Sequence, residues 1–392
     1  MKTAKVCERY CIGCGLCKSE IGTELKALPS GFLSPVMSEK KEEKEFLEKI
    51  CPVNGPQNGI SCGEIWGEYN GIYGAYSADD IIRRKASSGG VLTALATFLL
   101  DSGEVDGIIQ VTSLEEDPTK TKCQVSTTKE EVLQCCGSRY SISSPWISLN
   151  DLVDSNKKYA AVGKPCDITA LRNLKNQGEK YKNIIYLLSF FCAGLPSQQA
   201  NDRLLATMNC QKENCTSLTY RGNGWPGYAT ATDKLNRQYT MEYSKAWGGI
   251  LGRDVNPYCR ICIDGIGESA DISCGDGWYS LENGEPDFSE REGRNVVFVR
   301  TEAGSELYKK AIENGEIISE AWESLDNLAK IQKYQYTRRA TMSAKLWAYR
   351  LFGKPVPGYD KTALKSYAKH ASLKQKGKIF LGMVKRIVLK KI

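Results

Sequence analysis

Histidine is almost absent from this chain, because His370 is the single one in 392 residues. This scarcity argues against imidazole-based acid–base catalysis and against zinc sites that mix cysteine with histidine. Long apolar runs are also missing. The longest one near a predicted helix, Val91 to Leu100, is about half the length needed to span a bilayer. The N-terminus lacks the apolar segment of a signal peptide, so we predict a cytoplasmic protein.

Cysteine, in contrast, is abundant, with 16 in the chain. In a reducing compartment these residues are expected to be metal ligands or buried thiols rather than disulfides. Hydrophobic residues make up 41% and charged residues 25% of the sequence, which is typical of a globular protein. At 392 residues the chain is too long for one small core, so we expect two or three structural units.

Changes in cysteine content, hydrophobic periodicity and charge divide the chain into three regions. Residues 1–65 carry six cysteines and little periodic hydrophobicity, which predicts a small ferredoxin-like α+β domain held together by metal. Residues 66–305 alternate between predicted helices and strands and form the expected α/β core. Residues 306–392 are predicted to be helical, and their last part, 340–392, has thirteen Lys or Arg and one acid.

The central region predicts a parallel or mixed β-sheet. Residues 159–163 and 184–191 form apolar strands, and a short helix through Ile168, Leu171 and Leu174 lies between them. A strand, a helix and a strand within some thirty residues are typical of a βαβ unit, whose strands run parallel. The fold class is therefore α/β.

The first cysteine group is Cys11-x-x-Cys14-x-x-Cys17, completed by Cys51. Three thiolates at this spacing surround one face of a cubane, and Cys51-Pro52 matches the ending of a ferredoxin motif. We predict a [4Fe–4S] cluster here, with a four-cysteine zinc site as the alternative. Cys7 and Cys62 have no place in this scheme and are taken as spare thiols.

The second group is scattered in sequence. Cys166 and Cys192 each follow a predicted strand, and parallel neighbours would bring both to the same carboxyl edge of the sheet. Cys259-x-x-Cys262 is a pair that chelates one metal centre well. We predict a second [4Fe–4S] cluster on these four residues. The alternatives are a redox pair at 259 and 262, or buried thiols at 166 and 192.

A candidate phosphate site precedes the helix that begins near residue 91. Ser87, Ser88, Gly89 and Gly90 leave free N–H groups at the helix start, and three cations lie just upstream. The alternative is an ordinary capped helix. A second polar turn, Gly137 to Tyr140, can meet the same ligand. Arg221, Asn223 and Trp225 lie in a Gly/Pro-rich loop that either lines a substrate site or is purely structural.

Taken in order, these motifs resemble the coenzyme F420 hydrogenase/dehydrogenase beta-subunit family. The match rests on Ser87–Gly90, Gly137–Tyr140, Gly163–Cys166, Phe191–Gly194, Cys259–Asp264 and Ala270–Asp276. The resemblance implies an α/β domain that binds FAD beside a [4Fe–4S] cluster. It implies cluster ligands at Cys166, Cys192, Cys259 and Cys262, and FAD contacts at Ser87–Gly90, Ser138, Arg139, Tyr140, Lys164 and Pro165. Lys164 and Asp167 depart from the residues commoner in the family.

The expected function follows from two clusters and FAD. The chain would be an oxidoreductase that transfers electrons between a one-electron carrier, such as ferredoxin, and an organic substrate. The alternatives are an electron-transfer adaptor that serves a partner enzyme and has no substrate of its own, and a zinc-stabilised scaffold. No individual catalytic residue is assigned.

The basic C-terminal tail has two interpretations. Phe380, Val384, Ile387 and Val388 form an apolar stripe beside Lys385 and Arg386, so the helix either lies on the inner face of a membrane or is a solvated terminus. No base-reading motif accompanies the charge, and a nucleic-acid partner is not expected.

Overall fold

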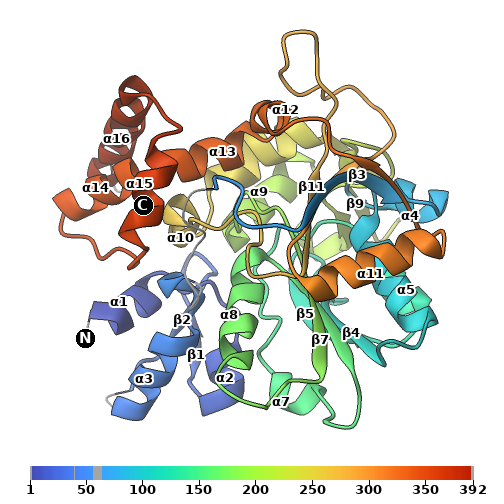
Figure 1. Ribbon diagram of the computed structural model, residues 1–392, viewed down its shortest axis with the longest axis horizontal. Coiled ribbons are helices and arrows are strands. Elements are labelled where there is room, and N and C mark those ends of the chain that lie inside the picture. The colour runs from blue at the N-terminus through green and yellow to red at the C-terminus, as the bar shows by residue number, and fades with distance from the viewer. Residues whose placement is uncertain (1, 39, 56–63, 390–392) are drawn as a thin grey trace.

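The computed structural model describes residues 2–38, 40–55 and 64–389. Its centre is an eight-stranded mixed sheet in the order β13-β3-β12-β11-β7-β6-β4-β5. The strands are β3 (Gly71–Ser77), β4 (Gly107–Ser113), β5 (Thr121–Ser126), β6 (Tyr159–Gly163), β7 (Ile184–Phe190), β11 (Ile272–Asp276), β12 (Asn295–Val299) and β13 (Ile317–Ala321). The predicted α/β class with a mixed or parallel sheet is confirmed (Figure 1).

The parallel part of the sheet is its middle. β4, β6, β7 and β11 pair in parallel, whereas β5, β12, β3 and β13 join antiparallel at the two sides. β6 and β7 are neighbours, as the βαβ pattern predicted, and α8 (Pro165–Lys175) connects them. The strands β6 and β7 are buried and almost wholly apolar, because helices or loops cover both faces of the sheet there.

The helices that surround the main sheet are short, and several of them are capped by side chains. Asp79, Thr128 and Ser197 accept hydrogen bonds from the first turns of their helices. The helices are α4 (Asp80–Lys85), α5 (Val91–Asp101), α6 (Lys129–Gln134), α7 (Leu149–Leu152), α8, α9 (Gln198–Thr207), α10 (Pro257–Ile261) and α11 (Glu302–Glu313).

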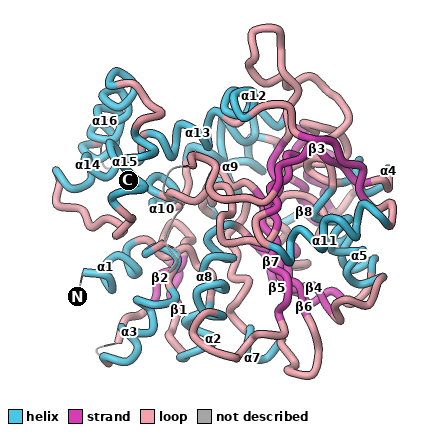
Figure 2. The backbone as a smooth tube through the Cα atoms, in the orientation of Figure 1, coloured by secondary structure: helices cyan, strands magenta, loops and turns pink. Residues whose placement is uncertain are grey.

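Two smaller sheets are not hydrogen-bonded to the main one, and the N-terminal one lies to its left in Figure 2. The first, β1 (Leu25–Ala27) with β2 (Leu33–Pro35), belongs to the N-terminal region together with α1 (Lys2–Arg9), α2 (Leu16–Ile21) and α3 (Lys41–Ile50). The second consists of β8 (Cys215–Thr219), β9 (Tyr228–Asp233) and β10 (Gln238–Glu242). A π-helix, Ser244–Ile250, follows β10.

The C-terminal region is helical, and it begins later than expected. The boundary drawn at residue 305 falls inside α11, and β13 pairs with β3 as an edge strand of the main sheet. The remaining helices are α12 (Leu325–Ile331), α13 (Lys333–Ala340), α14 (Met342–Leu351), α15 (Lys361–Ala368) and α16 (Leu373–Val388). α14, α15 and α16 gather on the side of the molecule away from α4, α5 and α11 (Figure 1).

The two ends of the chain share a hydrophobic core. Val6, Cys7 and Tyr10 belong to the same buried cluster as Tyr349 and Tyr367. The Tyr10 hydroxyl also donates a hydrogen bond to the carbonyl of Pro355 at 2.8 Å. The N-terminal region is therefore packed on the C-terminal helices as well as on the sheet domain. Among the described residues, no helix is long and apolar enough to cross a bilayer.

Candidate functional site

The two polar loops proposed for phosphate binding contact each other. The Ser87 hydroxyl accepts a hydrogen bond from the backbone N–H of Ser138 at 2.6 Å, and the Ser88 hydroxyl donates to the carbonyl of Arg294 at 2.8 Å. Gly90 has φ +81°, a left-handed conformation that favours glycine and turns the chain into α5. The N–H of Val91 is already bound by Asn295 at 3.3 Å, so part of the helix terminus is occupied from within the protein.

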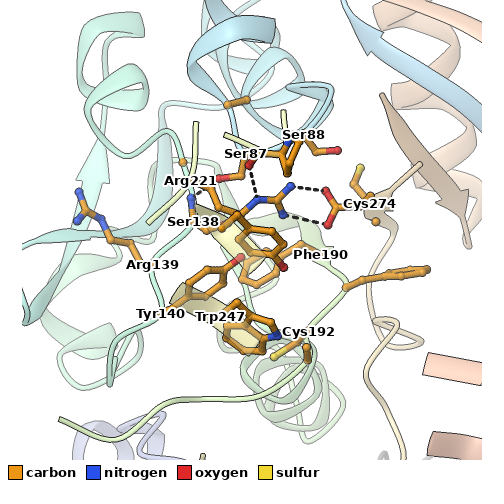
Figure 3. Close-up of a pocket in the computed structure, with 18 of the residues that line it drawn as sticks. Ser87, Ser88, Ser138, Arg139, Tyr140, Phe190, Cys192, Arg221, Trp247 and Cys274 are labelled. Carbon is orange, nitrogen blue, oxygen red and sulfur yellow. Dashed lines mark hydrogen bonds and ion pairs between the residues drawn. The ribbon is translucent and has the colours of Figure 1, made fainter. Parts of the chain in front are cut away.

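These loops form one wall of a cavity of about 860 Å³ (Figure 3). This volume lies in the range of pockets that hold small organic molecules and cofactors. Several residues expected to contact a cofactor line the cavity: Ser87, Ser88, Gly90, Ser138, Arg139, Tyr140 and Lys164. Gly89 and Pro165 do not. A side chain on Gly89 would meet the Ala75 carbonyl at 2.7 Å, so this glycine permits close backbone packing instead.

Arg139 lines the cavity without offering its charge to it. Its guanidinium points away from the other labelled side chains in Figure 3 and donates to the carbonyl of Leu218 in β8 at 2.8 Å. This side chain thus joins the loop to the small sheet.

The wall next to these loops is aromatic and contains the buried guanidinium of Arg221, which is ion-paired. Arg221 forms two bonds with Asp276, at 3.0 and 3.1 Å, and its guanidinium lies 4.2 Å from the centre of the Tyr243 ring. Trp247 packs on Tyr140 with ring centres 4.7 Å apart. Of the three residues considered in the Gly/Pro-rich loop, Arg221 lines the cavity, whereas Asn223 and Trp225 do not.

Tyr243 and Trp247 were missed by the sequence analysis. They are four residues apart, and a π-helix carries Trp247. Such helices are rare and are frequent at functional sites. The sequence signal was weak, because two aromatics at this spacing are also typical of an ordinary buried helix face.

The second cysteine group lies behind the cavity, at the carboxyl edge of the parallel strands. Cys166 is in the first turn of α8, after β6, and Cys192 follows β7. Cys259 is in α10, and its sulfur accepts a hydrogen bond from the N–H of Leu195 at 3.3 Å. Cys192 itself is part of the cavity wall. The topology thus brings the four predicted ligands to one region.

Burial and mutual repulsion disfavour free thiolates in this group. Burial, together with the neighbouring Cys259, raises the pKa of Cys192 to about 11. Burial likewise raises the pKa of Cys262 to about 12. Thiolates at such positions need a bound cationic centre to be stable. The donor set therefore fits a metal cluster.

α13 fixes the loop that carries Cys192. Gln335 donates to the Cys192 carbonyl at 3.1 Å, while Tyr334 and Arg338 both donate to the Ala193 carbonyl at 3.0 Å. These three residues come from the C-terminal region, and no sequence motif marks them. Their side chains immobilise the backbone next to one predicted ligand.

The first cysteine group forms around a second, small cavity of about 30 Å³. Cys11 and Cys14 lie on the loop entering α2, Cys17 is in the first turn of α2, and Cys51 follows α3. Gly15 has φ +87°, and a side chain there would collide with the backbone of Ile147 at 2.6 Å. The curled loop between the cysteines therefore depends on this glycine. Burial raises the pKa of Cys11 to about 12 and that of Cys17 to about 11.

Cys7 also lines this small cavity, so five thiols surround it. A hydrogen bond with Cys51 lowers the pKa of Cys7, and the amide of Asn54 donates to its sulfur at 3.6 Å. Cys7 is thus a neighbour of the predicted ligands and not a distant thiol. Cys62 lies outside the described residues.

The two cysteine groups share supporting residues. Asn256, which caps α10, donates to the Cys11 carbonyl at 2.8 Å, and Tyr258 donates to the Pro52 carbonyl at 3.2 Å. Lys164 binds the Asp167 carboxylate at 2.6 Å in a buried pair. A negative charge on Asp167 raises the pKa of both Cys14 and Cys166, in addition to the effect of burial, so this carboxylate lies within electrostatic reach of both groups.

Within residues 2–38, 40–55 and 64–389, no set of three or more His, Cys, Asp or Glu side chains converges on a single ion.

A cofactor-sized cavity at the carboxyl edge of parallel strands, with one group of cysteines beside it and a second group around a separate small cavity, is the arrangement of an α/β electron-transfer protein. Residues 72–150 match the model for the N-terminal part of the coenzyme F420 hydrogenase/dehydrogenase beta subunit, and residues 156–324 match the model for its C-terminal part. The chain belongs to this family, as its motifs predicted.

Similar proteins include the coenzyme F420 hydrogenase subunit beta of Methanosarcina barkeri, 29% identical over 68% of this chain and 88% of that protein. The coenzyme F420-dependent sulfite reductase of Methanocaldococcus jannaschii is 25% identical over 83% of this chain and 49% of that protein. A chain of the F420-reducing [NiFe] hydrogenase complex of Methanosarcina barkeri shares the fold, with a TM-score of 0.58, 24% identity and coverage of 76% of this chain and 98% of that one. These relatives are oxidoreductases or their subunits, which agrees with the predicted class.

Proposed function

We propose that this protein is a cytoplasmic iron–sulfur flavoprotein oxidoreductase. It transfers electrons between a one-electron carrier, such as ferredoxin, and an organic substrate. The observation that supports this proposal most directly is the position of Cys192. This residue lies in the wall of the large cavity and also belongs to the second cysteine group, so an organic cofactor in the cavity and a cluster on the cysteines would be direct neighbours.

The residues fit the two kinds of cofactor. FAD would occupy the large cavity, held by the backbone and hydroxyls of Ser87, Ser88 and Ser138 and bounded by Tyr140. One [4Fe–4S] cluster would be bound by Cys166, Cys192, Cys259 and Cys262, and the other by Cys11, Cys14, Cys17 and Cys51. When bound, FAD exchanges hydride with organic molecules and single electrons with clusters, which is the conversion that this function requires.

The protein's own side chains provide orientation and fixed charge. The Arg221–Asp276 pair is buried at the cavity wall, so it presents a planar, nearly neutral unit rather than a free cation. The Lys164 ammonium lines the cavity as well. Burial opposes its charge, but the Asp167 carboxylate raises its pKa above the ordinary value, so it stays protonated. The Lys164–Asp167 pair thus places a fixed dipole, rather than a free cation, at this wall.

An electron-transfer adaptor is the second candidate function. The relatives' names describe beta subunits of hydrogenases and formate dehydrogenases, so those proteins work with partner chains. As an adaptor, the chain would hold FAD in the cavity, and this FAD would exchange electrons with a partner enzyme. The partner, and not this chain, would bind the substrate.

The test is to purify the full chain without oxygen and to count iron, labile sulfide and released flavin. We expect about eight irons, about eight sulfides and one FAD per chain. Zinc without sulfide or flavin would contradict the proposal. Reoxidation of the reduced protein by small organic acceptors, in the absence of any partner, would distinguish the enzyme from the adaptor.

A further inference from the structure

α16 has two apolar sides, although a surface helix needs only one to pack against the protein. Met383 and Ile387 are buried and pack, together with Phe380, onto the hydrophobic cluster that includes α14. Leu373, Leu381 and Val388 lie elsewhere on the helix and are 85%, 66% and 60% exposed. The packing of the protein therefore explains the first set of apolar side chains but leaves the second set in contact with water.

The exposed apolar side chains are bordered by a row of lysines. Lys374, Lys378 and Lys385 are spaced by four and seven residues, so they share one face of the helix, and all three are exposed. Leu381 and Val388, seven residues apart, form the adjoining strip on the same outer side. The outer surface of α16 thus combines a cationic line with a parallel apolar line.

No acid in the described residues compensates this charge locally. α16 contains five basic residues and no Asp or Glu, and none of its lysines forms an ion pair within the described part of the chain. Residues 340–392 as a whole contain thirteen Lys or Arg and only Asp360 as an acid. The surface is therefore complementary to a partner that carries many negative charges.

This surface is separate from the redox centre. The family models end at residue 324, and α16 begins at Leu373. In Figure 1, α14, α15 and α16 form a group at one side of the molecule, away from α4 and α5, which flank the cavity loops. No residue of α16 lines either the large or the small cavity.

We propose that the outer face of α16 is a docking surface for an anionic lipid bilayer, which it contacts while lying in the plane of the headgroups. Lysines beside exposed leucine and valine are the composition of an interfacial helix, whose apolar side enters the boundary with the acyl chains. Nucleic acid would account for the lysines alone, since its backbone offers nothing to Leu373, Leu381 and Val388. The proposal is independent of the cofactor assignment.

The experiment measures sedimentation of the full-length, anaerobically purified protein with lipid vesicles. One vesicle population contains anionic phosphatidylglycerol, and the other contains phosphatidylcholine alone. We expect binding to the anionic vesicles that weakens as salt is added, because the lysines act through a screened field. Binding of the same strength to both populations, or to neither, would overturn the proposal.

Two variants separate the charge from the apolar contact. Lys374→Gln/Lys378→Gln/Lys385→Gln is expected to weaken binding roughly a hundredfold, since each cation near an anionic surface contributes about a factor of five. Leu381→Ser/Val388→Ser should weaken binding at all salt concentrations. Leu235→Ser is a matched control, because Leu235 is 71% exposed in the β9–β10 turn.

The controls also exclude a general effect of charge. Lys122→Gln/Lys182→Gln/Lys309→Gln removes the same number of exposed lysines elsewhere and should leave binding unchanged. Unchanged iron content and circular dichroism would show that the α16 variants are folded. Equal loss of binding in both lysine triple variants would contradict a specific surface. Binding to an RNA column without binding to vesicles would show that the surface docks nucleic acid and would overturn the proposal.

Discussion

The two cysteine groups are assembled in different ways. The first has three of its predicted ligands within seven residues, Cys11 to Cys17, and a single long-range partner, Cys51. The second takes its members from three separate segments, after β6, after β7 and in the region of α10. The first group is therefore defined by a local loop, and the second by the sheet. We expect damage to the loop to remain local and damage at the sheet edge to reach the large cavity.

The largest expected effect is the loss of half the iron. Cys14→Ser and Cys192→Ser should each lose about four of the eight irons, as one cubane each. The Cys192 variant should also bind less flavin, because Cys192 lines the cavity and Cys14 does not. The measurement is iron, sulfide and flavin per chain. Cys274→Ser is the matched control, since Cys274 lines the same cavity but belongs to neither group; loss of iron there would invalidate the ligand assignment.

Asp167 connects the two groups and should affect both when replaced. Asp167→Asn leaves the Lys164 ammonium buried without its carboxylate, so we expect a loss of about 3–5 kcal/mol in the free energy of unfolding. The missing negative charge should also raise the reduction potentials of both clusters. Anaerobic urea unfolding and a redox titration followed by electron paramagnetic resonance measure these effects.

A pair at the surface provides the control for Asp167. Glu285 contacts Lys333 at 2.8 Å, but both side chains are at least half exposed. Glu285→Gln should therefore change stability by less than about 1 kcal/mol and should leave both potentials unchanged. A shift of only one potential in Asp167→Asn would show that the carboxylate does not act on both sites.

Cys7 and Cys51 offer a finer comparison within the first group. Both line the small cavity and are hydrogen-bonded to each other. We expect Cys51→Ser to lose one cluster, and Cys7→Ser to keep about eight irons while the spectrum of the first cluster changes slightly. Iron counts with resonance Raman spectra of the Fe–S modes measure the difference. The reverse pattern would assign Cys7 as the fourth ligand.

The smallest expected effect is that of removing the tail. Deletion of residues 374–392 should leave iron and flavin content unchanged, because α16 packs chiefly on α14 and contacts neither cavity. The deletion exposes apolar surface on α14, so a modest decrease in melting temperature is expected. Loss of iron or flavin in this variant would show that the tail supports the redox centre.

The sequence predicted those parts of the molecule whose signals are local or periodic. The apolar runs at 159–163 and 184–191 became β6 and β7, paired in parallel as expected. The same pattern predicted that Cys166 and Cys192 would emerge at one edge. Interactions between distant segments left no such signal. β13 lies near the start of the region that was predicted to be helical, and the sequence pattern did not predict it as a strand. It is a strand because it pairs with β3, a segment about 240 residues earlier in the chain.

In the candidate site, too, local motifs were predictable from the sequence, whereas contacts between distant segments were not. Ser87 and Ser138 were recognised as polar turns, and the structure brings them into contact. The wall formed by Tyr243 and Trp247 depends on a π-helix, for which sequence offers no reliable pattern. Gln335 and Arg338 donate hydrogen bonds to the backbone carbonyls of Cys192 and Ala193. Every residue has such a carbonyl, so residue types alone do not indicate these contacts. Such residues become visible only when the tertiary arrangement is known.

The shared core of the two chain ends has a consequence for biosynthesis. A ribosome releases Val6, Cys7 and Tyr10 long before it has made Tyr349 and Tyr367, which complete the cluster around them. Early-emerging domains normally fold while translation continues. Here the N-terminal cysteines must wait for nearly the whole polypeptide before their apolar surroundings exist. Iron–sulfur assembly at that end is therefore expected to be a post-translational event, in which the nascent thiols need protection from oxidation.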